Sequence, residues 1–271
     1  MNPAESGSCD NTFLVRQSKC TKIDKIVHYD VTNARKPIGV RTVMCNTLFL
    51  QRSDLSPGQN MQTAEIDEIY KKVPLEKIPW NIETPPDALT ELVKSRKVRP
   101  CRVVDLGCGA GNYAVWLAGL GFDVTGVDSS PAAIQIAREN AVKKGVRCTF
   151  VVADLLGDLR PVEGTFDFAY DYELLHHLMP EERAVYIKNV HRLTRPHAVY
   201  LSVCFSDDDP QFGGVGKTRK TPMGTILYFS SEDEIRYLVS PHFRILELKT
   251  VDVAAKFGGT HKAIYVLCER R

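Results

Sequence analysis

Short apolar runs alternate with amphipathic stretches from residue 101 onward. The runs at 101–106, 123–127, 148–153, 166–170 and 198–205 have the length and the apolar character of buried strands. Between them, the stretches 112–120, 131–144 and 180–193 repeat apolar residues at helical spacing. Strands that alternate with helices form a parallel sheet covered by helices on both faces. The pattern therefore predicts a doubly wound α/β fold.

Capping residues mark the predicted helix boundaries. Ser130 is suited to cap a helix that has Pro131 in its first turn, and Gly145 is suited to end that helix. The helix at 180–193 should bury one side, which carries Val185, Ile187, Val190 and Leu193.

The end of the chain predicts a hairpin. A helix at 231–239 precedes two further apolar runs, at 243–251 and 263–268, and the short link between them contains Gly258 and Gly259. Such a link joins antiparallel neighbours. We therefore expect a mostly parallel seven-stranded sheet whose final strand is antiparallel.

The first hundred residues divide into two parts. Residues 61–97 predict two short helices around a proline-rich bend, the first with Ile66, Ile69, Tyr70 and Val73 at helical spacing. Residues 1–60 lack such a pattern and end in a turn-rich segment at 56–60. We expect an N-terminal extension of uncertain structure at 1–60 and a main domain at 61–271, of which 61–97 forms a helical cap.

Composition narrows the class of protein. The chain has 271 residues, 44% of them hydrophobic and 25% charged, with a net charge of +2. This charge does not call for a nucleic-acid partner, and no apolar run is long enough for a membrane span. The eight cysteines form no C-x-x-C pair, and no secretory signal is evident. We expect reduced thiols, no bound metal and a cytoplasmic protein.

A glycine-rich turn follows the first apolar run. Gly107, Gly109 and Gly111 alternate with other residues directly after the run that contains Asp105. Glycine permits a tight turn and lets a ligand approach the backbone closely. The G-x-G-x-G spacing differs from that of dinucleotide-binding turns. A carboxylate at Asp105 would repel a pyrophosphate but would suit an ammonium group.

The next two strands also end in aspartates. Asp128 ends the second run and could accept both hydroxyls of a ribose. Asp154 follows the third run and could accept a hydrogen bond from an adenine amine, while Leu155 offers a backbone donor. Ligands of open α/β sheets bind beyond the carboxyl ends of the strands, so these residues should share one site.

These residues resemble the class I S-adenosylmethionine (SAM)-dependent methyltransferase family. The resemblance covers residues 61–271 and rests on the D-L-G-C-G-A-G turn at 105–111 together with Asp128 and Asp154. It implies a Rossmann-like methyltransferase fold and SAM as the cofactor. It also implies that the three glycines shape the cofactor cradle, that Asp105 holds the methionine end and that Asp128 holds the ribose.

The fourth run leads into the segment that borders the methyl group and the acceptor in that family. It begins at Tyr170, a predicted cofactor contact, and ends in a His-His-Leu sequence; its candidate residues are Asp171, Tyr172, His176 and His177. The Asn/Asp-Pro-Pro-Tyr sequence of adenine- and glutamine-methylating branches is absent, which disfavours those acceptors. The segment resembles a variant in which a Pro-Glu-Glu-Arg helix start follows, here at 180–183, common among small-molecule methyltransferases.

Either histidine could act as a base for an acceptor that is protonated when it attacks. The alternative is that one histidine packs or caps the following helix and that the other is solvated. Asp171 is a third candidate in the catalytic group, although we expect it and Tyr172 to line the site. Before the next strand, the family's Arg-Pro-Gly-Gly turn is replaced by Arg195-Pro196-His197-Ala198.

Two further segments could cover the pocket. Tyr70 and Trp80 precede the glycine turn, where similar methyltransferases carry covering helices, although packing at the edge of the core is the alternative. The charged, glycine-rich loop at 206–225 is expected to be either a mobile cover or a solvated insert. Its acidic residues 207–209 are adjacent in a loop, and such carboxylates seldom converge on one metal ion.

The favoured function is methyl transfer to a small thiol, amine or metalloid anion, given a weak likeness to tellurite and thiopurine methyltransferases. A protein or RNA acceptor is an alternative, supported by basic residues between 16 and 41. A non-catalytic SAM-binding module and an NAD-dependent oxidoreductase are two others. The glycine spacing and Asp105 argue against the last.

Overall fold

The computed structural model describes residues 61–271, with side-chain surroundings from Ala64 onward. The expected extension at 1–60 and its basic residues lie outside the described residues. Six α-helices and two short 3-10 turns are present in the described part. They are α1 (Met61–Lys72), η2 (Leu75–Lys77), α2 (Asp87–Lys94), α3 (Asn112–Gly119), α4 (Pro131–Lys144), η3 (Leu175–His177), α5 (Pro180–Leu193) and α6 (Glu232–Val239).

A seven-stranded sheet forms the centre of the fold, in the order β3-β2-β1-β4-β5-β9-β8. Its strands are β1 (Arg102–Leu106), β2 (Asp123–Asp128), β3 (Thr149–Val152), β4 (Phe166–Tyr172), β5 (Thr194–Phe205), β8 (Phe243–Ala254) and β9 (Thr260–Arg270). The strands β1 to β5 are parallel, and β9 is antiparallel to both of its neighbours. The predicted fold class is therefore confirmed. The sequence did not predict that β9 enters the sheet between β5 and β8.

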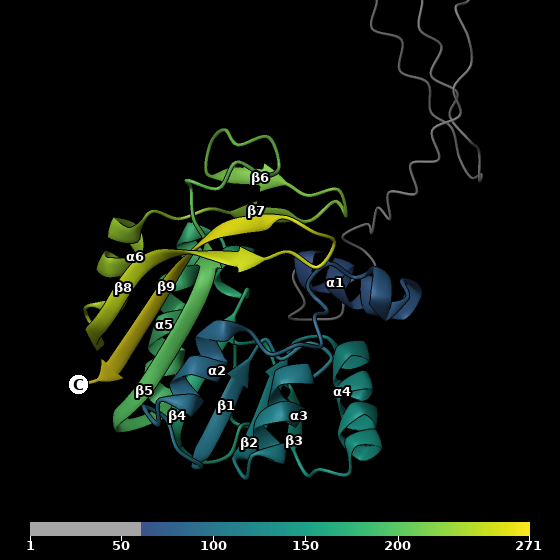
Figure 1. Cartoon of the computed structure of the whole chain (residues 1–271), viewed down its shortest axis with the longest axis vertical. Helices are drawn as coiled ribbons and strands as arrows, with labels where there is room; N and C mark the ends of the chain where they lie inside the picture. The colour runs from purple at the N-terminus through teal and green to yellow at the C-terminus, as the bar shows by residue number, and fades with distance from the viewer. Residues whose placement is uncertain (1–60) are drawn as a thin grey trace, which may run out of the picture. The chain divides into compact units, whose positions relative to one another are not determined.

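Helices cover both faces of the sheet. Figure 1 shows α2 and α3 in front of the strands and α5 behind them. On β1, Val103 packs into the core on one face and Val104 into the core on the other, and both are fully buried. Parallel strands buried on both faces read as continuous apolar runs, which is why the pattern was visible in the sequence. No helix in the described part of the chain is long and apolar enough to cross a membrane.

The predicted caps explain the helix boundaries. The Ser130 hydroxyl accepts a hydrogen bond from the amide of Ala133 at the start of α4, and Gly145 ends that helix with φ 67°. The helix α5 spans the predicted 180–193. One detail was wrong: Val185 was placed on the apolar side but is 46% exposed.

The segment at 206–225, expected to be a mobile cover or a solvated insert, contains regular structure that neither prediction included. It contains β6 (Thr218–Lys220), which pairs with β7 (Ile226–Tyr228) in a small antiparallel sheet. The buried Arg219 guanidinium donates to the carbonyls of Asp207, Asp209, Gln211 and Gly216 and lies 4.0 Å over the Phe229 ring. The Arg219 guanidinium thus provides hydrogen bonds for four backbone carbonyls of this segment. Hydrophobic periodicity in the sequence does not reveal such an arrangement.

The adjacent acidic residues of that segment also have separate partners. The Asp209 carboxylate accepts from the amides of Gln211 and Lys262 and lies 2.9 Å from His261 Nδ1. Asp207 pairs with Lys217 at 3.2 Å.

Candidate functional site

One pocket lies at the carboxyl ends of β1, β2, β3 and β4. Its walls combine the glycine turn, the strand ends and the cap formed by α1 and the 73–86 bend. Its lining includes Asp105, Gly107, Gly109, Asp128, Asp154, Leu155, Tyr172 and His177, with Tyr70 and Trp80 from the cap. The structure thus brings together ten of the residues predicted from the sequence. Tyr170, Asp171, His176 and Gly111 do not line it.

The glycine turn leaves no space for side chains. Gly107 and Gly109 have φ values of 75° and 52°. A Cβ on Gly107 would lie 2.8 Å from Leu174 Cδ1, and one on Gly109 would lie 2.5 Å from the Tyr70 hydroxyl. These are steric reasons for glycine, separate from contact with a ligand. Gly111 serves packing, since its Cβ would lie 2.8 Å from that of Ala137.

Replacing Gly109 by alanine should weaken SAM binding by about tenfold or more, since a left-handed backbone at a non-glycine residue costs about 1–2 kcal/mol and the new methyl collides with Tyr70. Adding Tyr70→Phe should restore part of the affinity, because the colliding oxygen is removed. Isothermal titration of both variants checks this. Unchanged affinity in the single variant would show that the turn tolerates a side chain and that its tightness does not matter for binding.

Asp105 is the buried carboxylate at the base of the pocket. It is 3% exposed, and its Oδ2 atom has no hydrogen-bond partner among the described residues. The Tyr170 hydroxyl lies close enough to lower the pKa of Asp105, against the effect of burial. Its geometry does not meet the criteria for a hydrogen bond to this carboxylate. Burial raises the pKa of Asp105 to about 7. A buried acceptor without a donor indicates that a ligand supplies one.

Tyr170 therefore stands behind Asp105 in the core, fully buried and outside the pocket lining. The prediction that Tyr170 contacts the cofactor is not supported by this position. Tyr170 shares a face of β4 with Tyr172 but precedes it by two residues, so it packs in the core beneath the strand end while Tyr172 reaches the pocket.

Asp128 and Asp154 organise the two neighbouring strand ends. Asp128 accepts from the Gly109 amide at 2.9 Å through Oδ2 and from the Ser130 amide at 2.8 Å through Oδ1. Asp154 Oδ1 accepts from the Leu156 amide at 2.9 Å. Each carboxylate oxygen has a second lone pair, so these bonds leave capacity for ligand hydroxyls or an amine. Sequence reasoning did not foresee that Asp128 also fixes the glycine turn.

The cap is tied to the pocket by polar contacts. Trp80 Nε1 donates to the Tyr70 hydroxyl at 3.0 Å, and the Trp80 ring meets His177 edge-on with centroids 6.1 Å apart. In the middle of α1, Asp67 accepts from the Ser130 hydroxyl at 2.6 Å and from the Ala132 amide at 3.0 Å. Tyr70 and Trp80 thus belong to one wall, and Asp67, which the sequence did not single out, docks that wall on α4.

The end of β4 contributes two residues that sequence reasoning missed. Glu173 lines the pocket directly after the strand, and Tyr113 faces it from α3. The Tyr113 and Tyr172 rings meet edge-on at 5.8 Å. Glu173 belongs to the 170–178 segment that the sequence analysis singled out. Its position in that segment did not distinguish it from the two histidines as a candidate.

Two predicted catalytic residues lie in the core instead. Asp171 is fully buried and accepts from the hydroxyls of Tyr186, Tyr200 and Ser202 at 2.6–2.8 Å. Burial raises its pKa to about 6, although the three hydroxyl donors oppose the shift. His176 is 2% exposed, stacks on Phe205 at 4.0 Å and accepts from the Phe205 amide through Nδ1. Neither side chain lines the pocket, because alternation along β4 and the η3 turn point both of them into the core.

His177 is the histidine that lines the pocket. Burial lowers its pKa to about 4, so the imidazole is neutral near pH 7. The η3 turn that presents it is held by Arg183, whose guanidinium donates to the carbonyls of Leu175 and Leu178 at 3.0 and 2.9 Å. The Arg of the Pro-Glu-Glu-Arg sequence is thus a positioning residue for His177.

The residues present fit SAM as the ligand. The unpartnered Asp105 Oδ2 can accept from the ammonium group, the glycine turn permits close approach of the methionine part, and Asp128 and Asp154 stand at the next strand ends in the order that ribose and adenine require. A pyrophosphate would meet Asp105 and Asp128 instead of cations.

Comparison with known proteins agrees with this fit. Residues 103–197 match a family model described as a methyltransferase domain. The chain is 29% identical over 184 residues to the 2-heptyl-1-hydroxyquinolin-4(1H)-one methyltransferase of Mycobacteroides abscessus, an alignment that covers 67% of this chain and 75% of that enzyme. Several other curated relatives are matched over only 20–46% of their length.

Two solved structures share the fold. One comes from work on the conversion of a disulfide bond into a thioacetal group during echinomycin biosynthesis; it has a TM-score of 0.64 and 27% identity, and the match covers 77% of this chain and 92% of that one. The other is the 1,6-didemethyltoxoflavin-N1-methyltransferase of Burkholderia thailandensis, bound to 1,6-didemethyltoxoflavin and S-adenosylhomocysteine. It has a TM-score of 0.53 and 21% identity, over 77% of this chain and 84% of that one.

Proposed function

Since the chain contains a class I SAM-dependent methyltransferase domain, we propose that it methylates a small aromatic or heteroaromatic acceptor on an oxygen or a ring nitrogen. The observation that carries this proposal is the ring-lined wall beside the end of β4. Tyr113 and Tyr172, whose rings meet edge-on, form it, and Trp80 lines the same pocket from the cap. Aromatic walls of this kind hold planar ligands.

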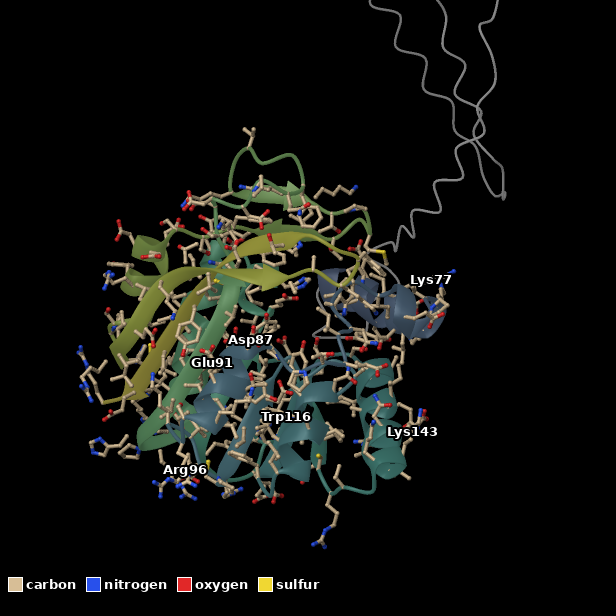
Figure 2. The ribbon with its side chains drawn as sticks, in the orientation of Figure 1. Lys77, Asp87, Glu91, Arg96, Trp116 and Lys143 are labelled. Carbon is tan, nitrogen blue, oxygen red and sulfur yellow. The ribbon has the colours of Figure 1, made fainter. Side chains whose placement is uncertain are left out.

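A second groove adjoins the pocket, which supports an acceptor too large to fit in the pocket alone. It runs between α2 and the strands β8 and β9 and shares Ile82, Tyr113 and Tyr172 with the pocket. Figure 2 labels Asp87 and Glu91 on α2, the helix that forms one of its walls. Proline and valine side chains lie between the charged ones, so the groove suits the non-reacting part of an amphipathic molecule.

The named relatives are consistent with this acceptor class. The mycobacterial enzyme is named for a hydroxyquinolinone, and the toxoflavin enzyme was solved with a heteroaromatic acceptor bound. The thiol, amine and metalloid anion expected from the sequence remain comparison substrates, because sulfur acceptors would fit the same wall.

When bound, SAM supplies an electrophilic methyl group on a sulfonium. The chain's own residues position the reactants, which is the main requirement of an in-line displacement. Asp105 and the glycine turn orient one partner, and the wall of Tyr113 and Tyr172 orients the other. Tyr70 and Trp80 of the cap line the pocket beside the strand ends, and we expect them to limit the access of water to this space.

Two alternatives differ in support. The protein or RNA acceptor rests on basic residues that lie outside the described residues. A non-catalytic module would need only the residues that hold SAM. In this pocket, Tyr113, Tyr172 and Glu173 also line the space beside those residues, which favours an enzyme. The NAD-dependent alternative is contradicted by the methyltransferase family match.

The test is titration of the full chain with SAM and S-adenosylhomocysteine, followed by turnover assays that detect S-adenosylhomocysteine. The acceptor panel is 4-hydroxyquinoline, 4-nitrophenol, benzimidazole, 4-nitrothiophenol, benzylamine and tellurite. We expect binding of both nucleosides and turnover of at least one aromatic oxygen or nitrogen acceptor. Turnover of tellurite or benzylamine alone would contradict the acceptor class, and binding without any turnover would favour the non-catalytic module.

A further inference from the structure

We propose that Glu173, and not either histidine, accepts the proton of the methyl acceptor, because its carboxylate lines the pocket at the strand end where the acceptor wall meets the cofactor cradle. This inference rests on the proposed function and adds the group that makes a neutral hydroxyl or ring N–H reactive. The sequence pattern did not single out this residue.

The backbone at Glu173 is held in a conformation that glycine would adopt more easily. Its φ is 66°, in the left-handed region, and its amide donates to the Val203 carbonyl at 2.8 Å. A non-glycine residue there is strained, and such strain is concentrated at functional sites. The ladder with β5 therefore keeps Glu173 in place at the point where β4 turns toward η3, with its side chain at the pocket.

The surroundings of the carboxylate suit proton transfer. Burial raises the pKa of Glu173 to about 7, and no charged or hydrogen-bonding partner in the described part of the chain offsets this burial. Tyr113 of α3 and Tyr172 of β4 face it, and burial, together with the charge of Glu173, raises the pKa of both hydroxyls. Asp105 of β1 and His177 of η3 line the same pocket. A base whose pKa lies near the working pH is partly ionised at that pH and still binds a proton strongly enough to remove it from the acceptor.

The histidines are less suited to this task. His176 lies in the core with Nδ1 accepting from the Phe205 amide. His177 lines the pocket, but its lowered pKa of about 4 makes it a weak base. Its ring packs against Trp80, which fits a role in shaping the wall.

The proposed step balances as follows. The acceptor's O–H or N–H proton moves to a Glu173 carboxylate oxygen. The electron pair released on the acceptor atom forms the bond to the methyl carbon. The pair of the carbon–sulfur bond stays on sulfur, and Glu173 returns its proton to solvent after the product leaves.

The test compares Glu173→Gln with wild type on two acceptors that differ in ionisation. A hydroxyl acceptor such as 4-hydroxyquinoline needs a base, whereas 4-nitrothiophenol is already an anion near pH 7. We expect kcat for the hydroxyl acceptor to fall about 100-fold or more and that for the thiol to change by less than about fivefold. Measurements at saturating SAM, which keeps Asp105 ionised, should show a wild-type rise in kcat through about pH 7 that the variant lacks.

Two readouts do not depend on turnover. In carboxyl-labelled protein, NMR titration should show one glutamate resonance that titrates near pH 7 and is absent from Glu173→Gln. Glu173→Gly should raise the unfolding temperature, because glycine relieves the strain, and it should still bind SAM. Glu163→Gln is the matched control, since Glu163 is exposed in the loop before β4.

The outcomes separate the two proposals. Equal loss on both acceptors, an unchanged pH profile in Glu173→Gln or no glutamate titrating above about pH 6 would overturn the role of Glu173. If wild type turns over no acceptor in the panel, the proposed function fails, and the base assignment fails with it.

Discussion

Replacing Asp105 by alanine should weaken the binding of SAM by roughly 10- to 100-fold while the protein stays folded. The Asp105 carboxylate is buried at the base of the pocket, and its Oδ2 atom has no donor among the described residues. A hydrogen bond to a charged group contributes about 1.5–3 kcal/mol, which corresponds to this loss of affinity. Isothermal titration with SAM and S-adenosylhomocysteine measures the effect.

The pH dependence of that binding gives a second test of Asp105. Burial raises its pKa to about 7, so in the unliganded protein the carboxyl holds a proton below that pH. An ammonium group binds best when the proton has left. Affinity should therefore rise as pH increases through about 7 and should not do so in the Asp105→Ala variant.

Asp123→Ala is the matched control for Asp105. It lies at the opposite end of β2, and its side chain is 74% exposed. We expect this control to bind SAM as wild type does. Wild-type affinity in Asp105→Ala would mean that the cofactor's amino group is held elsewhere and that the pocket has been assigned the wrong orientation.

Replacing Asp171 by alanine should destabilise the protein by about 3–5 kcal/mol, because three buried hydroxyls lose their acceptor. Tyr186, Tyr200 and Ser202 come from α5 and β5, so the carboxylate joins the helix behind the sheet to two strands. Urea denaturation measures the free energy of unfolding. Fluorescence titration with SAM on the folded protein then shows whether the pocket is affected.

Conservative variants distinguish this structural role from a catalytic one. Asp171→Asn keeps one acceptor oxygen and should cost less stability than alanine, and Tyr200→Phe should cost about 1 kcal/mol. SAM affinity and kcat of these milder variants should stay close to wild type. A large loss of kcat in Asp171→Asn without a loss of stability would restore the catalytic role expected from the sequence.

Short segments of the sequence were sufficient to predict the helices and strands of the main domain and the pocket residues at the ends of β1, β2 and β3. The apolar runs predicted the parallel strands, because strands covered on both faces leave no polar alternation. Ser130, Pro131 and Gly145 set the bounds of α4 through short-range capping geometry. The glycine turn and the aspartates at the carboxyl ends of β1, β2 and β3 converge because parallel strands place these ends at one edge of the sheet.

Local signals failed where a side chain's direction decides its role. Within 170–178, the sequence offered several titratable residues of similar promise. Backbone direction at the end of β4 sends Asp171 and His176 into the core and leaves Glu173 and His177 at the pocket. The backbone at His197 gives a second example. Its φ is 64°, in the left-handed region that glycine usually occupies, and only the structure shows that histidine adopts this conformation here.

The sequence by itself determined the doubly wound sheet, the antiparallel final strand and the order of the pocket residues at the strand ends, since each depends on periodicity, capping or strand ends that short segments encode. Tertiary structure alone decided the insertion of β9 between β5 and β8, the docking of α1 through Asp67 and the burial of the Asp105 carboxylate beside Tyr170. These depend on contacts between residues far apart in the chain, and burial, which sets both the pKa values and the accessible side chains, arises only from those contacts.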